Sequence, residues 1–303
     1  MNAKTLLLPL LLFLAACSTA PTASPMFDPA KYGTAEVNIP YCAAEDNIVE
    51  PIEAPVQQMD VYYPASGGPW PVFVYVHGGS WMEGDKAEGE GWRGLNEQGF
   101  LVVSLNYRLS PINKFPTMIE DVKCAVRFLR AHAGDFNLDP DHIAALGASA
   151  GGHLVALLGV ADESAGWDVE YYAEQSSRVQ AVITIAGFFD FSQKIPGGVG
   201  TPIYTAFGAL AGTDSPKLTA ASPITYVTPD DPPFLIFHGT RDNIAPPEQS
   251  RIMDEQLRAA GVPSTIIMVE GGDHGLGGPD ANPSPSEVYE MIVNFLTAQL
   301  KNN

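Results

Sequence analysis

Positively charged side chains are scarce in this chain. Its 303 residues include 16 Lys and Arg against 35 Asp and Glu, which gives a formal net charge of −19 at neutral pH. A surface with this charge repels the phosphate backbone of nucleic acids, so we expect no nucleic-acid partner. The acidity helps to keep a protein in solution and by itself indicates no substrate.

Cysteine and cofactor motifs are also scarce. The chain has three cysteines, Cys17, Cys42 and Cys124. Neither a metal-ligand cluster nor a phosphate loop or dinucleotide motif occurs in the sequence, so we expect no metal and no cofactor. An oxidising compartment would permit a Cys42–Cys124 disulfide. The helical pattern around Cys124 nevertheless favours a small buried thiol there.

The chain lacks an apolar run long enough for a membrane-spanning helix. The run at residues 6–14 is too short to cross a bilayer, and Lys4 precedes it. A charged start, a short apolar segment and the small residues that follow are typical of a secretory signal. We therefore expect residues 1–16 to be a signal peptide.

Cys17 directly follows Leu-Ala-Ala, which resembles the bacterial lipoprotein box. The resemblance implies cleavage before Cys17 and lipidation of its thiol, so that the mature chain is exported and anchored to a membrane. Ser18, rather than Asp, follows the cysteine, and this implies the outer membrane, at its periplasmic or surface face. An ordinary signal peptide with a chance cysteine is the alternative.

Composition changes again after the cysteine. Residues 17–35 are rich in small residues and proline, without apolar periodicity, so we expect a flexible tether. Residues 36–303 have the length and hydrophobic content of one domain with a single large core. The sequence leaves the oligomeric state open.

Short apolar runs alternate with helical patterns along this domain. We expect strands at residues 58–63, 71–76, 100–105, 143–146, 179–185, 234–237 and 264–269. We expect helices at residues 115–132, 153–160, 248–260 and 287–300. This alternation predicts the α/β class, with a mostly parallel sheet and helices on both faces. Functional groups should then gather beyond the carboxyl ends of the strands.

The pentapeptide Gly147-Ala148-Ser149-Ala150-Gly151 fits the pattern Gly-x-Ser-x-Gly. It lies between an expected strand and an expected helix, where such a turn lifts a serine hydroxyl above the sheet. We predict that Ser149 is a nucleophile. On the pentapeptide alone, a Gly- and Ser-rich turn without chemistry is the alternative.

A second glycine-rich loop, His77-Gly78-Gly79-Ser80-Trp81, directly follows the expected strand at residues 71–76. Glycines let a loop turn its amides inward, toward an oxygen that becomes negative during acyl transfer. We predict an oxyanion hole formed by the amides of Gly78 or Gly79 together with that of Ala150. His77 is expected to brace the loop.

A serine nucleophile needs a histidine base and a carboxylate that orients it. In hydrolases with this elbow the chain order is serine, acid, histidine. Asp242 and His274 fit this order, and each lies just past an expected strand. Asp190 is a rival acid. The remaining histidines are expected to be surface or structural residues: His132, His142, His153 and His238.

The combined motifs resemble a known group of proteins. HGGSWMEGDK, NYRLSP, DPDHIAALGASAGGHLVALL, HGTRDNIAPPEQS and GGDHG are similar, in this order, to the bacterial esterase and feruloyl-esterase-like (BD-FAE-like) branch of the α/β hydrolases. This branch is related to the hormone-sensitive-lipase group, and the resemblance covers roughly residues 59–300. It implies an α/β-hydrolase fold without a large cap domain. It also implies a triad of Ser149, Asp242 and His274, with an oxyanion hole from Gly78, Gly79 and Ala150.

Two residues depart from the pattern of these relatives. Ser80 stands where the family often has a third glycine, and Ala148 stands where the lipase-like group often has Asp. Neither change removes a predicted catalytic group. Both leave the subfamily open.

We therefore predict a serine carboxylic-ester hydrolase that forms an acyl-enzyme. Short-chain, aryl or acetyl esters are the expected substrates, including esters linked to carbohydrate. Residues 186–228 are expected to form the longest loop. Its aromatic residues should either line a modest pocket over Ser149 or cover the end of the sheet: Phe188, Phe189, Phe191, Tyr204 and Phe207. An arylformamidase, which shares the His-Gly-Gly-x-Trp loop, and a non-catalytic binding module are the alternatives.

Overall fold

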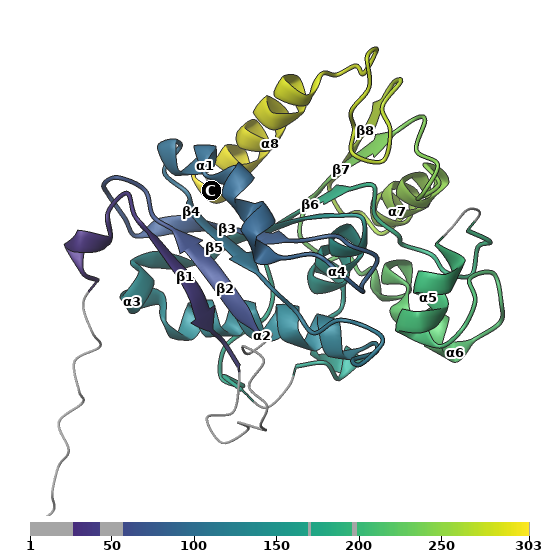
Figure 1. The fold of residues 1–303 in the computed structure, drawn as a ribbon, viewed down its shortest axis with the longest axis horizontal. Coiled ribbons are helices and arrows are strands. Elements are labelled where there is room, and N and C mark those ends of the chain that lie inside the picture. Colours follow the sequence, from purple (N-terminus) through teal and green to yellow (C-terminus); the bar gives the residue numbers. More distant parts are fainter. Residues whose placement is uncertain (1–26, 43–56, 169–170, 196–198, 303) are drawn as a thin grey trace, which may run out of the picture.

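The computed structural model describes residues 27–42, 57–168, 171–195 and 199–302 (Figure 1). Its centre is an eight-stranded sheet in the order β1-β2-β4-β3-β5-β6-β7-β8. Strand β2 is antiparallel to both of its neighbours, and every other neighbouring pair is parallel. The predicted α/β class and mostly parallel sheet are thus confirmed.

The strands lie close to their expected positions. They are β1 (Ala35–Pro40), β2 (Gln58–Tyr62), β3 (Trp70–Val76), β4 (Leu101–Leu105), β5 (Leu138–Ala148), β6 (Ala181–Ile185), β7 (Phe234–Gly239) and β8 (Ser264–Val269). Strand β5 begins earlier than expected. Strand β1 was not predicted, because as an edge strand it is largely exposed and has no apolar periodicity.

Helices connect the strands. The α-helices are α1 (Gly94–Glu97), α2 (Thr117–Ala131), α3 (Ala133–Phe136), α4 (Ala150–Val160), α5 (Gly200–Phe207), α6 (Pro216–Ala221), α7 (Glu248–Ala259) and α8 (Pro285–Leu300). The 3-10 helices are η1 (Pro29–Lys31), η2 (Lys86–Trp92), η3 (Glu163–Ala165) and η4 (Pro223–Tyr226).

The sheet separates two hydrophobic clusters. Helices α2, α4 and α7 cover one face through residues such as Val126, Leu154 and Met253. Helices α1 and α8 cover the other face, where Leu95 and Ile292 pack against the sheet (Figure 1). A parallel sheet buried on both faces explains why its strands have continuous apolar sequences.

The segment between β6 and β7 is more regular than expected. We predicted a long loop, but α5, α6 and η4 lie within it, beside α7 at one end of the sheet (Figure 1). These helices are short, and the Gly and Pro residues between them hid their periodicity. The described part of this segment forms no large cap over the sheet.

Cys42 and Cys124 form a disulfide, so the expectation of a free buried thiol at Cys124 was wrong. Their Cα atoms are 6.2 Å apart, and the bond joins the residues just after β1 to helix α2. The helix around Cys124 was predicted correctly. Sequence spacing could not show that β1 ends beside this helix, because the two cysteines are 82 residues apart.

Packed structure begins before the predicted domain boundary at residue 36. The ring of Phe27 lies 5.3 Å from that of Tyr32 and 5.4 Å from that of Trp70. Residues 27–35 are therefore not a flexible tether. The predicted signal peptide and Cys17 lie outside the described residues. Within the described residues, no helix has the length and apolarity needed to cross a membrane.

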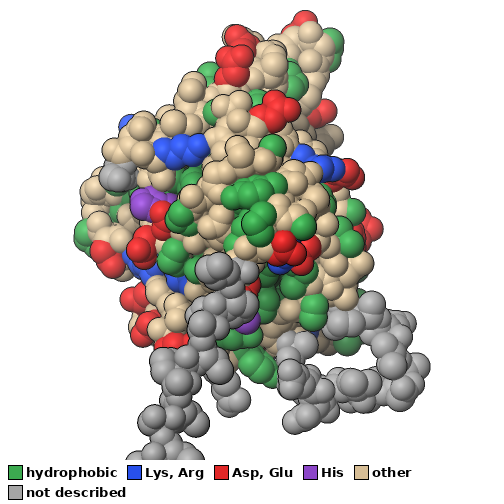
Figure 2. Space-filling view, turned by 90° about the vertical axis from the view of Figure 1, so that its left-hand side faces the viewer, with side chains coloured by type: hydrophobic (Ala, Val, Ile, Leu, Met, Phe, Trp, Pro, Cys, Tyr) green, Lys and Arg blue, Asp and Glu red, His purple; other side chains and the backbone are tan. Residues whose placement is uncertain are grey.

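Acidic side chains are spread over the surface. In the face shown in Figure 2, red Asp and Glu side chains lie scattered among hydrophobic and uncharged ones. This distribution agrees with a general surface charge, because the acidic residues are not gathered into one patch on that face.

Candidate active site

Ser149 occupies a strained turn between β5 and α4. Its φ of 55° and ψ of −118° are unusual for a residue with a side chain, as expected at a nucleophile elbow. Glycines make the turn possible. A Cβ atom at Gly147 would lie 2.2 Å from the oxygen of Gly151, and one at Gly151 would lie 2.1 Å from the oxygen of Val76.

The loop after β3 lies against this turn. A Cβ atom at Gly78 would lie 3.5 Å from the Cβ of Ser149, so the two backbones are in close contact. The loop then passes through left-handed conformations at Gly79, Ser80 and Trp81. Among the hydrogen bonds of the described residues, the amides of Gly78, Gly79 and Ala150 have no protein acceptor. These are the three amides predicted for the oxyanion hole.

Trp81 fastens this loop to the helix that follows the nucleophile. Its indole Nε1 donates to Nδ1 of His153 in α4, at 3.1 Å. The other ring nitrogen of His153, Nε2, donates to the oxygen of Ala221 at 2.7 Å. Burial lowers the pKa of His153 to about 4, so the ring is neutral and its Nδ1 can accept. His153 is thus structural, as expected.

The aromatic residues after β6 support Trp81. Phe188, Phe191 and Phe207 pack around its ring, with centroids 4.9–6.0 Å away. They and Phe189 are buried in the core, whereas Tyr204 is 56% exposed. The phenylalanines therefore form part of the core and are closed to a ligand, which matches the second of the two roles considered for them. Trp81 itself is fully buried, so it does not contact substrate either.

His77 braces the same loop from inside. Its Nδ1 lies 2.9 Å from the oxygen of Gly78, and its ring stacks on Tyr107 with a centroid distance of 4.4 Å. The hydroxyl of Tyr107 donates to the oxygen of His77 at 3.1 Å. Burial lowers the pKa of His77. These contacts agree with a bracing role.

Asp242 and His274 meet beyond the carboxyl ends of β7 and β8. Nδ1 of His274 lies 2.7 Å from Oδ2 of Asp242, whose side chain is fully buried. Oδ1 of Asp242 accepts from the amides of Ile244 and Ala245, at 2.8 and 3.0 Å. Because Nδ1 of His274 donates to a carboxylate, Nε2 is left free to accept a proton.

His238 is a further partner of Asp242. Its Nε2 lies 2.9 Å from the oxygen of Ala245 and 3.1 Å from Oδ2 of Asp242, so this nitrogen carries the proton. Its Nδ1 lies 2.6 Å from the hydroxyl of Ser250. We expected only a structural role for His238. Its position four residues before Asp242, at the end of the same strand, was the available signal for this contact.

Hydrogen bonds keep Asp242 ionised. Burial opposes the charge, but bonds from His238, His274 and the amide of Ile244 outweigh it and hold the pKa well below its usual range. The rival Asp190 accepts from the amide of Ser192 instead, and Asp273 accepts from amides of its own loop. Neither carboxylate is hydrogen-bonded to the His274 ring.

The hydrogen bond expected between Ser149 and His274 is not formed in this structure. Among the described residues, Ser149 Oγ has no hydrogen bond to His274, although both stand at the same edge of the sheet. Such bonds are often long without a substrate. Two partly exposed histidines lie elsewhere: His132 pairs with Asp135 and His142 with Asp139. The described residues also hold no group of three or more His, Cys, Asp or Glu that could bind a metal.

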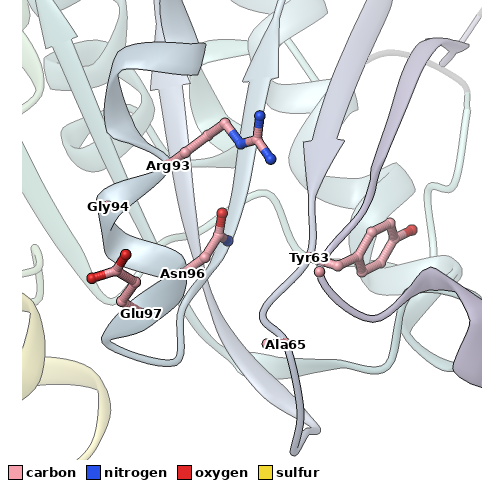
Figure 3. A pocket seen from close by; sticks show the side chains of 7 residues that line it. Tyr63, Ala65, Arg93, Gly94, Asn96 and Glu97 are labelled. Atoms are coloured by element: carbon pink, nitrogen blue, oxygen red, sulfur yellow. The ribbon is translucent and has the colours of Figure 1, made fainter.

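A cavity of about 360 Å³ lies near the carboxyl end of β2, at the end of the sheet opposite Ser149. Figure 3 shows the side chains of Arg93 and Asn96 on the side of α1 toward Tyr63, which follows β2, whereas that of Glu97 points away from Tyr63. Because β2 is antiparallel to β4, its carboxyl end lies away from Ser149. This cavity is therefore separate from the candidate active site.

Comparison with known proteins gives consistent relatives. Esterase LipC of Mycobacterium tuberculosis is 36% identical over 203 residues, which cover 63% of this chain and 49% of the relative. The probable carboxylic ester hydrolase LipM of the same organism is 34% identical over 198 residues, covering 63% and 46%. This chain thus spans about half the length of these curated relatives.

Solved structures resemble this one over most of its length. A truncated carbohydrate esterase from gut microbiota has a TM-score of 0.75 at 29% identity, covering 91% of this chain and 99% of that one. The butyrate-bound esterase Est2 of Thermogutta terrifontis has a TM-score of 0.70 at 27% identity, covering 88% and 95%. The sequence model of the BD-FAE family matches residues 59–257. The chain therefore belongs to the BD-FAE family of α/β hydrolases.

Proposed function

We propose that this chain is a serine carboxylic-ester hydrolase in which Ser149 is the nucleophile and His274 the general base. The observation that carries the proposal is the 2.7 Å contact between Nδ1 of His274 and the buried carboxylate of Asp242. It leaves Nε2 of His274 as a proton acceptor at the sheet edge where the elbow presents Ser149. A neutral histidine oriented in this way is what a serine hydroxyl needs to become reactive.

Acylation follows from this arrangement. Nε2 of His274 takes the proton of Ser149 Oγ while Oγ bonds to the ester carbonyl carbon. The carbonyl oxygen becomes negative and accepts hydrogen bonds from the amides of Gly78 or Gly79 and Ala150, each typically contributing about 3 kcal/mol to the transition state. The C–O bond to the alcohol then breaks, and the proton on Nε2 passes to the leaving oxygen.

Water completes the cycle by the same route. His274 takes a proton from a water molecule, whose oxygen bonds to the acyl carbon. The bond to Ser149 breaks, Ser149 Oγ regains its proton from Nε2, and a carboxylic acid leaves. Asp242 stays ionised throughout because its pKa is held low, so its carboxylate can stabilise the protonated His274 that forms in each step.

Support for the substrate class comes from the relatives. The structures that resemble this chain include a carbohydrate esterase and an esterase with bound butyrate. We propose short-chain or acetyl esters as substrates, carbohydrate-linked esters among them. An arylformamidase role has less support, because the Trp81 that matches that group is buried and cannot contact substrate.

Hydrolysis of p-nitrophenyl acetate by the purified protein tests the proposal. We expect Ser149→Ala to lower kcat by a factor on the order of 10⁴ or more. A fluorophosphonate should add to the unaltered protein one adduct, detected by intact mass, and should not add to the variant. Equal rates for both proteins would refute the nucleophile, and no hydrolysis by either would favour a binding module. Faster turnover of N-formylkynurenine than of any ester would favour the arylformamidase.

A further inference from the structure

A cavity of about 310 Å³ opens beside His274, on the face of the sheet that α8 covers. Its walls contain no charged side chain. They include Trp92, Ile185, Leu276, Val288, Tyr289 and Ile292. A volume of this size and an apolar lining are typical of a site for a small organic group.

Two of the residues that line this cavity are direct neighbours of the candidate catalytic residues. Gly275, which lines it, directly follows His274. Ile185, which also lines it, accepts a hydrogen bond from the amide of Ser149 at 2.8 Å. The cavity therefore lies at the end of the sheet where Ser149 and His274 are found, unlike the cavity of Figure 3.

The cavity is shaped for a flat or branched apolar group. Trp92 and Tyr289 are stacked on one side, with ring centroids 6.3 Å apart and planes inclined by 22°. Both rings remain partly exposed. Leu276 completes the wall in a left-handed conformation, with a φ of 63°. Such strain in a residue with a side chain is concentrated at functional sites.

Local charge favours a neutral ligand. The pKa of Tyr289 is raised by burial and by the negative charge of Glu97, so its hydroxyl is uncharged. The same negative charge would repel a carboxylate or phosphate in the cavity. An uncharged aromatic or branched alkyl group is therefore the best match.

We propose that this cavity is the subsite for the alcohol half of the ester, and that it selects uncharged aromatic or branched alkyl alcohols. The inference rests on the proposed function. In that mechanism the leaving oxygen receives its proton from Nε2 of His274, so the alcohol carbons are the part of the substrate next to this histidine. The cavity that begins at Gly275 is in the position to receive them.

The test is the ratio of kcat/KM for benzyl acetate to that for ethyl acetate, measured by acid release. These esters share their acyl group and differ only in the alcohol. We expect Tyr289→Ala to lower the ratio about tenfold, because one aromatic contact is lost. Gly91→Leu should also lower the ratio, because Gly91 borders the cavity and a larger side chain there would fill part of it. The fold should tolerate this change, since a Cβ atom at Gly91 would meet no atom within 4 Å. Met291→Ala, exposed on the same helix and outside the cavity, is the control.

Two outcomes would overturn the subsite. An unchanged ratio in both variants would show that the cavity does not contact the alcohol. If the variants instead lower the ratio of kcat/KM for ethyl benzoate to that for ethyl acetate, the cavity binds the acyl half of the ester. In either case, hydrolysis by the unaltered protein and its loss in Ser149→Ala would leave the proposed function standing.

Discussion

The bond between Trp81 and His153 links the two halves of the candidate site. Trp81 ends the glycine loop whose amides we propose for the oxyanion hole, and His153 lies in the helix that begins after Ser149. This buried hydrogen bond is one of the contacts that hold the glycine loop beside the turn of Ser149. Catalysis depends on such placement to well under an ångström.

This bond predicts an acid-sensitive stability. The pKa of His153 is about 4 in the folded chain because of burial, against about 6.5 when unfolded. The unfolded state therefore binds a proton that the folded state excludes as the pH falls from 6.5 to 4. The contribution of His153 to the free energy of unfolding is fully present above pH 6.5. It is lost as the pH falls to 4, by a total on the order of 3 kcal/mol.

Chemical unfolding between pH 4 and 7.5 checks this expectation. His153→Gln should be less stable at neutral pH and should lose that part of the pH dependence. His142→Gln, which changes a partly exposed histidine, should retain it. A parallel loss of stability in the unaltered protein and in His153→Gln would contradict the assignment.

Most residues of the candidate site were accessible from the sequence because each follows a recognisable strand. Asp242 and His274 stand just past apolar runs, and Ser149 lies within a distinctive turn. The contact of His238 with Asp242 was missed, because a His-Gly turn has an adequate structural explanation of its own. The Trp81–His153 bond depends on two segments far apart in the chain, and local patterns carry no information about it.

At the scale of the elements, burial decided which ones could be predicted. Strand β3 is buried on both faces, so its sequence is apolar throughout and its position was clear. Strand β1 lies at the edge and is largely exposed, and its sequence has no such signal. Helices α5 and α6 have only eight and six residues, too few for an apolar pattern that repeats over several turns.

The disulfide between β1 and α2 makes a prediction about stability. It closes a loop of 82 residues, and cross-linking a loop of that length stabilises a fold by roughly 4 kcal/mol. Replacing both Cys42 and Cys124 by serine should lower the free energy of unfolding by about this amount, measured in guanidinium chloride.

Reduction provides the matched comparison. Dithiothreitol should destabilise the unaltered protein by a similar amount and leave the double-serine variant unchanged. If reduced and oxidised protein unfolded at the same denaturant concentration, the bond would have no role in stability.

At the scale of the whole molecule, the acidic domain would be held at a membrane by its N-terminus. We propose that residues 1–16 are removed and that Cys17 carries a lipid, on the support of the Leu-Ala-Ala-Cys sequence.

Expression in a Gram-negative host tests the anchor. Cys17→Ser should abolish labelling by radioactive palmitate and move the protein from the membrane to the soluble fraction. Ser18→Asp should keep the label but shift the protein from the outer to the inner membrane. Palmitate labelling that persists in Cys17→Ser would refute lipidation at this site.

Formation of the disulfide would also depend on the compartment that the protein reaches. Cys42 and Cys124 would stay as thiols in a reducing cytoplasm and would be joined only after transport into an oxidising compartment. The disulfide would then form only after export. A molecule that stayed in the cytoplasm would lack the bond and would be less stable. Cytoplasmic proteases would therefore degrade unexported molecules faster than the oxidised, exported protein.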